Sequence, residues 1–228
     1  MVRRNKMPGF KLAIDGPAGS GKSTISSLIA KKMGWTHIDT GAMYRAVTLQ
    51  AIELGIDLND ELAYSFLETS YIHYDYDKIF INQRDVTEDI RSDAVTKNVS
   101  LVSSFPYVRR KLVDLQKRAA EKGNIVMDGR DIGTVVLPHA DLKIFLTANV
   151  EERAKRRVKE NLKKGKEVEI EKVIKDISTR DEKDSTRKES PLRMAEDAII
   201  LDTTHLTIDE VVNKIIEMTD KKENKRGY

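Results

Sequence analysis

The stretch GPAGSGKS, at residues 16–23, lies just after the short apolar run at residues 10–14. Its pattern, Gly-x-x-x-x-Gly-Lys-Ser between a predicted strand and a predicted helix, is typical of a loop that binds nucleotide phosphates. Glycine suits such a loop because it adopts positive φ and has no Cβ, so the backbone wraps closely around the phosphates. The pattern therefore predicts a nucleoside triphosphate site. A glycine-rich turn that matches by accident would not explain the strand and helix signals on either side.

The last residues of this stretch match the needs of a triphosphate. Lys22 is placed to reach the β- and γ-phosphates, and Ser23 offers a hydroxyl to Mg²⁺. The helix expected to begin near Lys22 directs the positive end of its dipole toward the same anion. We therefore expect Mg²⁺ at Ser23, together with phosphates and water, and Thr24 beside the α-phosphate.

Composition restricts the class of protein. The 228 residues carry a net charge of +3 and are 39% hydrophobic and 34% charged, which is typical of a soluble globular protein. This charge is too balanced to indicate a nucleic-acid partner. No apolar run approaches the length of about 20 residues that a membrane span needs, so we expect no membrane partner. The absence of cysteine excludes disulfides and fits a cytoplasmic location, and we expect flexible tails at residues 1–7 and 221–228.

Short apolar strands alternate with helices along the chain. This alternation predicts an α/β fold with a doubly wound, parallel, five-stranded sheet and helices on both faces. The expected strands are at residues 10–14, 36–39, 125–128, 142–147 and 198–201. The expected helices are at residues 22–33, 41–54, 92–103, 106–122, 151–163, 169–186 and 208–219, and a β-hairpin is expected at 71–74 and 79–82.

Polar clusters follow three of the predicted strands. The phosphate loop follows the first strand, DTGAMYR at 39–45 follows the second, and DGRD at 128–131 follows the third. Because ligands bind beyond the carboxyl ends of the strands in such sheets, we expect the clusters to meet at one edge. Their arginines predict a second anionic ligand there, since the planar guanidinium group binds phosphate bidentately.

Thr40, Tyr44, Arg45 and Arg130 are the candidates for this second ligand. Thr40 and Tyr44 are four residues apart at the start of a predicted helix, so they share a face. An alternative role for Thr40 is the N-cap of that helix, and both roles are compatible. The alternative for Arg45 or Arg130 alone is a surface salt bridge.

Arg153 and Arg157 share one flank of the predicted helix at 151–163. The KKGK sequence at 163–166 ends that helix with a glycine, which predicts a mobile basic flap. Such a flap would bring arginine over a phosphoryl group as charge develops on it. The alternative is a solvated, charged helix.

Arg180, Asp184 and Arg187 lie together near the apolar stripe of the predicted helix at 169–186. Charged groups that face inward are costly to bury unless they bind a ligand or pair with one another. The trio therefore indicates either a binding site or an internal ion-pair network. The four histidines form no spaced cluster and are interpreted as structural.

The sequence resembles the cytidylate kinase family of P-loop nucleoside monophosphate kinases over nearly the whole chain, from Ile14 to Ile216. The most specific parts are TGAMYR at 40–45 and DGRDIGT at 128–134, whereas the phosphate loop alone indicates only the use of a nucleoside triphosphate. The segments EERAKRR at 151–157 and RDEKD at 180–184, with Arg187, Pro191 and Leu192, complete the resemblance.

The resemblance implies phosphoryl transfer from ATP, with Mg²⁺, to CMP or dCMP. It implies ATP binding by Gly16, Pro17, Ala18, Gly19, Ser20, Gly21, Lys22, Ser23 and Thr24. It implies CMP binding by Thr40, Tyr44, Arg45, Ser100, Arg109, Arg130, Asp131, Arg180, Asp184 and Arg187, with Ser100, Arg109 and Asp131 at the cytosine. Catalysis would depend on Lys22, Arg130, Arg153, Arg157 and Arg187, because the acceptor oxygen is already anionic and needs no general base.

The same resemblance implies a division of the chain into domains and a class of partners. It implies a P-loop core at residues 8–56, 106–152 and 167–220, an insert that binds the monophosphate at 57–105, and a lid at 153–166. The partners would be small nucleotides, and the protein would be a monomer. The alternatives are another small-molecule P-loop kinase, with shikimate or a different monophosphate as acceptor, a GTPase switch, a nucleic-acid-stimulated ATPase or a non-enzymatic nucleotide-binding module. A guanine-reading Asn-Lys-x-Asp motif is absent from the sequence.

Overall fold

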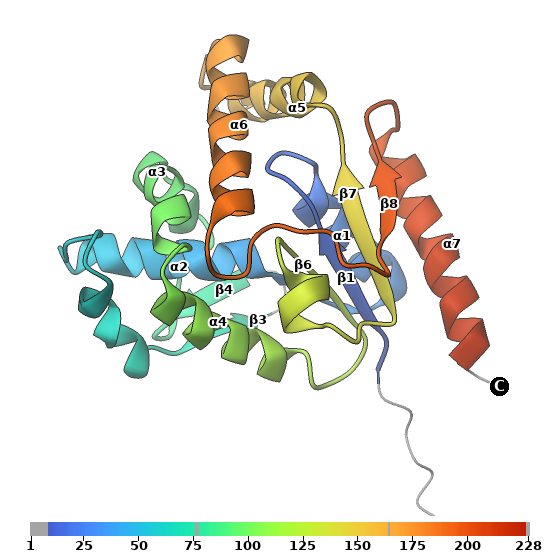
Figure 1. Ribbon diagram of the computed structural model, residues 1–228, viewed down its shortest axis with the longest axis horizontal. Coiled ribbons are helices and arrows are strands. Elements are labelled where there is room, and N and C mark those ends of the chain that lie inside the picture. Colours follow the sequence, from blue (N-terminus) through green and yellow to red (C-terminus); the bar gives the residue numbers. More distant parts are fainter. Residues whose placement is uncertain (1–8, 76–77, 164, 227–228) are drawn as a thin grey trace, which may run out of the picture.

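The computed structural model describes residues 9–75, 78–163 and 165–226. Within these ranges, five parallel strands form a central sheet in the order β2-β6-β1-β7-β8 (Figure 1). The strands are β1 (Lys11–Asp15), β2 (Thr36–Asp39), β6 (Ile125–Gly129), β7 (Leu142–Thr147) and β8 (Ile199–Asp202). The predicted doubly wound parallel sheet is therefore confirmed, and each predicted strand lies within one residue of its observed position.

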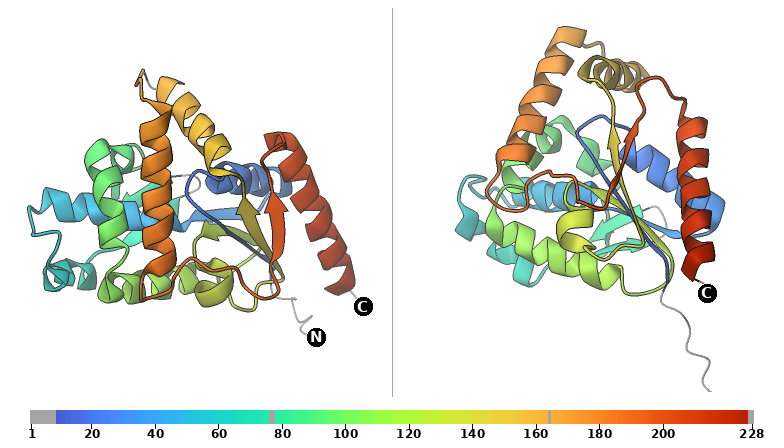
Figure 2. Two further views of the ribbon diagram at one scale, coloured as in Figure 1. Left: turned by 45° about the horizontal axis from the view of Figure 1, so that its top comes forward. Right: turned by 45° about the vertical axis from the view of Figure 1, so that its right-hand side comes forward.

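Helices cover both faces of this sheet. One face is covered by α1 (Lys22–Met33) and α7 (Ile208–Arg226), and the other by α2 (Thr40–Glu53) and α4 (Pro106–Ala119) (Figures 1 and 2). In β1, Leu12 and Ile14 belong to the core under α1 and α7, whereas Ala13 belongs to the core under α2 and α4. Successive side chains of a strand point to opposite faces, so a strand that is covered on both sides is apolar throughout.

The region predicted as an insert, residues 57–105, extends the core under α2. It contains η1 (Glu61–Glu68), β3 (Ile72–Asp75), β4 (Lys78–Ile81), β5 (Arg84–Asp85), η2 (Asp89–Arg91) and α3 (Asp93–Val102). Tyr64, Ile79 and Val95 are fully buried in the same cluster as residues of α2 and α4. The predicted hairpin is confirmed, although part of its turn, residues 76–77, lies outside the described residues.

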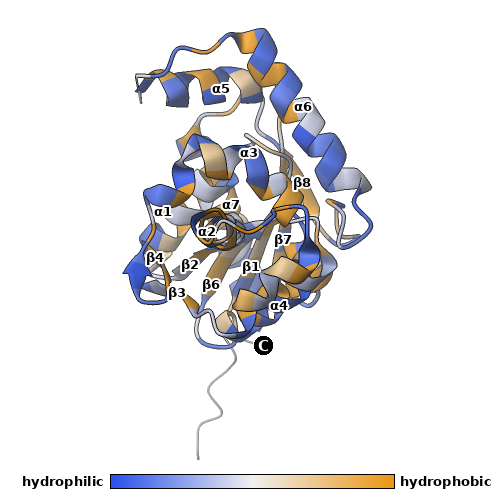
Figure 3. Ribbon diagram, turned by 90° about the vertical axis from the view of Figure 1, so that its left-hand side faces the viewer, coloured by the Kyte–Doolittle hydropathy of each residue, from blue (hydrophilic) through white to orange (hydrophobic). Residues whose placement is uncertain are grey.

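Two helices, α5 (Val150–Lys163) and α6 (Ile170–Thr186), stand away from the sheet (Figures 1 and 3). Ala154 of α5 packs with Val173 and Ile177 of α6 in a small cluster of their own. The lid predicted from the sequence ends at residue 166, but the apolar stripe of α6 packs on α5 rather than on the sheet. The two helices therefore form one unit, here named the α5–α6 pair. Lys164, within the predicted lid, lies outside the described residues.

The carboxyl end of the described chain is helical. α7 continues to Arg226, so the prediction of a flexible tail from residue 221 is wrong for residues 221–226. The Arg226 guanidinium lies 3.4 Å from an Asp141 carboxylate oxygen and over the ring of Phe10, which fixes the last turn. Residues 1–7 and 227–228 lie outside the described ranges. Among the described helices, none combines the length and the apolar character of a membrane span.

Candidate active site

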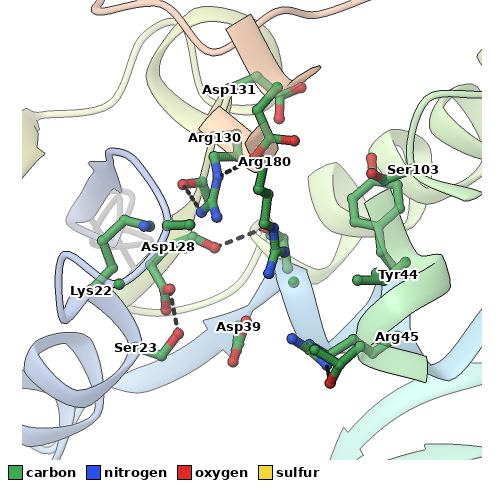
Figure 4. A pocket seen from close by; sticks show the side chains of 18 of the residues that line it. Lys22, Ser23, Asp39, Tyr44, Arg45, Ser103, Asp128, Arg130, Asp131 and Arg180 are labelled. Carbon is green, nitrogen blue, oxygen red and sulfur yellow. Dashed lines mark hydrogen bonds and ion pairs between the residues drawn. The ribbon is translucent and has the colours of Figure 1, made fainter. Parts of the chain in front are cut away.

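A pocket lies at the carboxyl ends of β1, β2 and β6, where the three predicted polar clusters meet (Figure 4). Side chains from α3, α4, α5 and α6 complete its wall. The lining residues are Ala18, Gly19, Gly21, Lys22, Ser23, Thr24, Asp39, Thr40, Gly41, Tyr44, Arg45, Arg91, Thr96, Val99, Ser103, Arg109, Asp128, Gly129, Arg130, Asp131, Arg157, Glu160, Arg180, Asp184 and Arg187. Most of the predicted site residues are among them, but Gly16, Pro17, Ser20, Ser100 and Arg153 are not.

The phosphate loop has the backbone that its glycines predict. Gly16 has φ 154°, and a Cβ there would lie 2.0 Å from the Leu146 carbonyl oxygen, so only glycine fits. Gly21, with φ 90°, directs the chain into α1 without a side-chain cap. The buried Lys22 Nζ donates to the Pro17 carbonyl oxygen at 2.7 Å. The loop is therefore preformed, and its lysine lies on its inner side.

Ser23 lies beside carboxylate oxygens at the end of the loop. Ser23 Oγ donates to Asp128 Oδ2 at 2.7 Å, and His37 Nε2 lies 2.6 Å from Asp128 Oδ1. The half-buried Asp39 also lines the pocket, and loss of solvent together with the charge of Asp128 raises its pKa. Two carboxylates and a hydroxyl that would be stabilised by a cation fit the preference of Mg²⁺ for oxygen.

Asp128, Asp39 and His37 are functional candidates that the sequence analysis missed. From the sequence, His37 is interpreted as structural, and the two aspartates belong to the polar clusters predicted at the strand ends without a role of their own. The pairing with Asp128 outweighs the effect of burial and raises the pKa of His37. The position of a carboxylate at the end of a parallel strand was the signal that could have identified Asp128 and Asp39.

At the centre of the pocket, the predicted trio of Arg180, Asp184 and Arg187 meets Arg130. Arg130 Nε donates to Asp184 Oδ2 at 2.8 Å, and Arg187 Nη1 lies 3.5 Å from Asp184 Oδ1. Burial raises the pKa of Asp184, but Arg130 and Arg180 outweigh it and hold that pKa below its usual value. Asp184 thus orients several guanidinium groups around one space. The trio therefore forms an ion-pair network, which was one of its two predicted alternatives. The residues of this network also line the pocket, so they remain available to a ligand.

At the far end of the pocket, Arg109 and Asp131 form a buried pair. Arg109 Nη2 donates to Asp131 Oδ2 at 2.5 Å, and the guanidinium group lies 5.3 Å from the ring centre of Tyr44. Ser103 lines this end, whereas Ser100 does not. The Ser100 Oγ is buried and has no hydrogen-bond partner among the described residues. Arg109 and Asp131 therefore both line the pocket, whereas Ser100 does not, and the role of the three residues at the cytosine stays a prediction.

Thr40 and Arg45 connect α2 to this pocket. Asp39, not Thr40, is the N-cap of α2, since its side chain accepts from the Ala42 N–H at 3.1 Å. The alternative of a plain N-cap role for Thr40 is therefore wrong, and its buried Oγ1 instead donates to the Asp128 carbonyl oxygen. Arg45 Nη1 donates to Thr96 Oγ1 at 3.0 Å, so the surface salt bridge is also wrong for Arg45.

Arg153 and Arg157, the two arginines of α5 that were predicted to act together, occupy different places. Arg157 lines the pocket, and its Nη1 lies 3.3 Å from Glu160 Oε2. Arg153 is buried behind the phosphate loop, where its Nη1 donates to the Ala18 carbonyl oxygen and to Asp181. The expected pair of flap arginines thus becomes one residue in the pocket and one that holds the loop. This difference arises because Arg153 is one turn closer to the start of α5, next to the loop.

The pocket is strongly cationic. Among the described residues that line it, eight side chains are basic and five are acidic. Burial, followed by the charge of Arg130, lowers the pKa of Arg180 to about 9. Burial, followed by the charge of Arg157, lowers the pKa of Arg45 to about 10. Burial and Arg130 also lower the pKa of Lys22 well below its ordinary value. An anionic ligand would relieve this repulsion. A phosphate loop that opens onto such a pocket is the arrangement of a P-loop kinase.

Comparison with known proteins shows to which family of P-loop kinases the chain belongs. The family model described as cytidylate kinase matches residues 12–221. The chain belongs to the cytidylate kinase family, and it is a phosphotransferase. It is 63% identical over 212 residues to the cytidylate kinase of Acholeplasma laidlawii, covering 93% of this chain and 96% of that protein. It is 52% identical over 218 residues to the cytidylate kinase of Carboxydothermus hydrogenoformans, covering 93% of this chain and 98% of that protein.

The solved structures give a more distant likeness. An uncharacterized protein from Eubacterium ventriosum ATCC 27560 has a TM-score of 0.52 and 14% sequence identity, covering 92% of this chain and 98% of that one. At this level of identity the likeness concerns the fold alone. The family match gives no support to the shikimate-type, GTPase, nucleic-acid-stimulated ATPase or non-enzymatic alternatives.

Proposed function

We propose that the protein transfers the γ-phosphoryl group of ATP to the 5′-phosphate of CMP or dCMP, giving ADP and CDP or dCDP. The observation that carries this proposal is the pocket itself. Its phosphate loop lies at one end, the buried Arg109–Asp131 pair lies at the other, and Arg130, Arg180 and Arg187 lie between them. Two anionic nucleotides placed end to end need such an excess of positive charge where their phosphates meet.

The donor end supplies backbone N–H groups and the Lys22 ammonium to the phosphates of ATP. Residues 16–24 would bind the donor, with the dipole of α1 directed at the same phosphates. Ser23, with Asp128 and Asp39 close by, would hold Mg²⁺, which supplies positive charge to the phosphate oxygens when bound. Lys22 would then move from the Pro17 carbonyl oxygen to the phosphates.

The acceptor end supplies guanidinium groups that are already oriented. Arg130 and Arg187 are held by Asp184, and Arg45 is held by Thr96, so their donors need little reorganisation when a phosphate enters. The attacking phosphate oxygen is already an anion, so a general base is unnecessary. Catalysis is then positioning together with stabilisation of the charge that develops on the transferred group. Arg157, on the α5–α6 pair, is the residue best placed to approach it from the lid side.

Recognition of cytosine rests on the Arg109–Asp131 pair. Cytosine presents an amine donor beside two acceptors, which match the Asp131 carboxylate and the Arg109 guanidinium group. Uracil presents a carbonyl oxygen in place of the amine, and that oxygen would face the carboxylate. A buried polar mismatch of this kind discriminates strongly between substrates. The buried Ser100 Oγ would complete the set if it turns toward the base.

The setting of the enzyme is proposed on the same basis. One chain provides both ends of the pocket, which supports action as a monomer. The cysteine-free sequence is compatible with the reducing cytoplasm, where we place the enzyme. We propose small nucleotides as its partners, without nucleic acid or membrane.

A panel of nucleoside monophosphates tests this function. Purified protein is incubated with ATP and Mg²⁺ together with CMP, dCMP, UMP, AMP or GMP, and the diphosphate formed is measured directly. The expected result is CDP and dCDP formation that greatly exceeds the other products, with ADP released in equal amount. ADP release that does not depend on any monophosphate, or equal use of UMP, would overturn the proposal.

A further inference from the structure

Both backbone groups of Ala18, in the middle of the phosphate loop, are held by the α5–α6 pair. The Ala18 N–H donates to Asp181 Oδ1 at 2.8 Å. The Ala18 carbonyl oxygen accepts from Arg153 Nη1, also at 2.8 Å. Ala18 is only 3% exposed, so water competes little for these contacts. The loop is therefore fixed from behind by side chains of two different helices.

The two side chains that hold Ala18 also bind each other. Arg153 Nη1 donates to Asp181 Oδ2 at 2.5 Å, and Arg153 Nε donates to the Ala148 carbonyl oxygen at 3.0 Å. Each carboxylate oxygen of Asp181 therefore has a separate partner. The negative charge of Asp181 is matched by Arg153, so it adds little repulsion toward an anion bound in front of the loop.

The α5–α6 pair also packs directly against the next residue of the loop. A Cβ built on Gly19 would lie 3.4 Å from Arg153 Cβ and 3.5 Å from Ile177 Cδ1. Packing and hydrogen bonds thus fix the same short piece of backbone. A loop that is fixed before its ligand arrives loses less conformational entropy on binding.

Asp181 is also next to a residue of the pocket. Arg180, one position earlier on α6, lines the pocket and points into it (Figure 4). Asp184, three positions later, orients Arg130. One helix therefore contacts the phosphate loop and the acceptor end of the pocket through nearly adjacent side chains, so a displacement of α6 acts on both.

We infer that Asp181 is a positioning residue for the donor, which fixes the phosphate loop by orienting Arg153 and the Ala18 peptide. The inference rests on the proposed function only in taking residues 16–24 as the donor site. A purely structural brace between α6 and the core would explain the contacts equally well, but it would affect stability and both substrates alike. A positioning residue instead changes donor binding selectively.

The test compares Asp181→Asn with Glu182→Gln, a matched control on the exposed side of the same helix. Asparagine keeps the shape of the side chain, but its amide nitrogen cannot accept a hydrogen bond and carries no charge for Arg153. Binding of a non-hydrolysable ATP analogue with Mg²⁺ is measured by calorimetry without any acceptor. CMP binding is measured separately, and amide hydrogen exchange is followed at Ala18.

We expect the donor Kd of D181N to rise about tenfold, since small displacements of a binding group are costly. The Kd for CMP should change less than about twofold, Ala18 exchange should accelerate, and E182Q should match the unsubstituted protein in every measurement. The variant Arg153→Lys, which retains a single donor group, should shift donor binding in the same direction by a smaller factor.

Two results would overturn the inference. One is a donor Kd for D181N that equals that of E182Q. The other is an equal loss of donor and CMP binding together with a lower melting temperature, which would reveal a general brace. If D181N does not fold, unchanged donor binding in R153K overturns the inference in the same way. Failure of the unsubstituted protein to phosphorylate CMP would contradict the proposed function but leave the donor measurement interpretable.

Discussion

The two ends of the pocket are built in different ways. The donor end is a contiguous stretch of backbone, residues 16–24, whose shape is set by glycine and by the start of α1. The acceptor end is a set of side chains from α2, α4 and α6 and from the residues just after β6 and α6, which are far apart in the sequence. In the proposed function, main-chain groups would bind the first nucleotide and paired guanidinium groups would bind the second. A local motif therefore predicts the donor end, whereas the acceptor end requires the fold.

The two ends of the pocket also differ in what surrounds their basic side chains. At the donor end, Lys22 is buried in a neutral loop and donates to a carbonyl oxygen. At the acceptor end, Asp131 and Asp184 separate and orient the arginines, which would otherwise repel one another. Loss of a donor cation should therefore reduce turnover, and loss of an acceptor carboxylate should change the choice of substrate. Four substitutions test this contrast.

The largest effect is expected at the donor end. Lys22→Ala removes a cation that would act on the transferred phosphoryl group in the proposed function, and kcat should fall by about 10²–10³-fold, the range for loss of one such electrostatic group. The measurement is steady-state CDP formation, with circular dichroism to verify the fold. Lys31→Ala, an exposed lysine on α1, is the control and should retain normal turnover. Near-normal kcat in K22A would remove Lys22 from the site.

The next effect concerns substrate choice at the acceptor end. Asp131→Asn removes the carboxylate that would accept from the cytosine amine, and it leaves Arg109 without its ion-pair partner. The preference for CMP over UMP, as a ratio of kcat/KM, should fall by about 10²-fold or more. The exposed Asp114 is the control, since D114N should keep the preference. A preference unaltered in D131N would show that another residue reads the base.

A third effect concerns Asp15, which connects the start of the phosphate loop to the segment that follows Asp131. The buried Asp15 carboxylate accepts from the N–H groups of Ile132 and Gly133, and burial raises its pKa to about 6. The folded state therefore holds the Asp15 proton more tightly than the unfolded state, which releases it near its ordinary pKa. Between about pH 4 and 6, Asp15 makes the free energy of unfolding fall as pH rises, by about 1 kcal/mol per pH unit.

Chemical denaturation of Asp15→Asn across this pH range checks that contribution. The pH slope of its free energy of unfolding should differ from that of the unsubstituted protein by about 1 kcal/mol per pH unit, because that contribution is lost. The other charged groups near Asp15 are Asp131 and Lys22, and both remain in the variant. Identical slopes for the two proteins would show that Asp15 titrates normally.

The smallest effect is expected outside the pocket. Arg84 Nη2 donates to both carboxylate oxygens of Glu53 on the surface, where solvent screens the pair. Arg84→Ala should lower the free energy of unfolding by less than about 1 kcal/mol and leave kcat and KM unchanged. Denaturation and steady-state assays measure both. A large loss of activity would mean that arginines outside the pocket also serve the reaction, which would weaken the contrast between its two ends.

Most of the fold could be predicted from the sequence because its signals are local. The apolar strands, the glycines at the ends of α1 and Pro106 at the first turn of α4 lie close to the structures that they determine. The η1 and β5 segments were missed: β5 has only two residues, and η1 is a short 3-10 helix within a stretch that was interpreted as irregular. The helical end of α7 was missed because Arg226 is fixed by Phe10 and Asp141, which are distant in the sequence.

The site was predictable to a lesser degree. Arg130, Arg180 and Arg187 could be found from their place after a strand or on a helix face. The different positions of Arg153 and Arg157 could not be predicted, because they depend on where α5 approaches the phosphate loop. The contact of His37 with Asp128 depends on the neighbouring positions of β2 and β6 in the sheet. Helical or strand periodicity does not contain this information.

Inhibition by a compound in which a chain of phosphates joins adenosine to cytidine measures most directly whether one pocket holds both nucleotides. With a chain of suitable length, the compound should compete with ATP and also with CMP, and it should bind more tightly than either substrate. It should also lose affinity in both K22A and D131N. Competition with only one substrate would contradict the arrangement of two phosphate-bearing ligands end to end between Lys22 and Asp131.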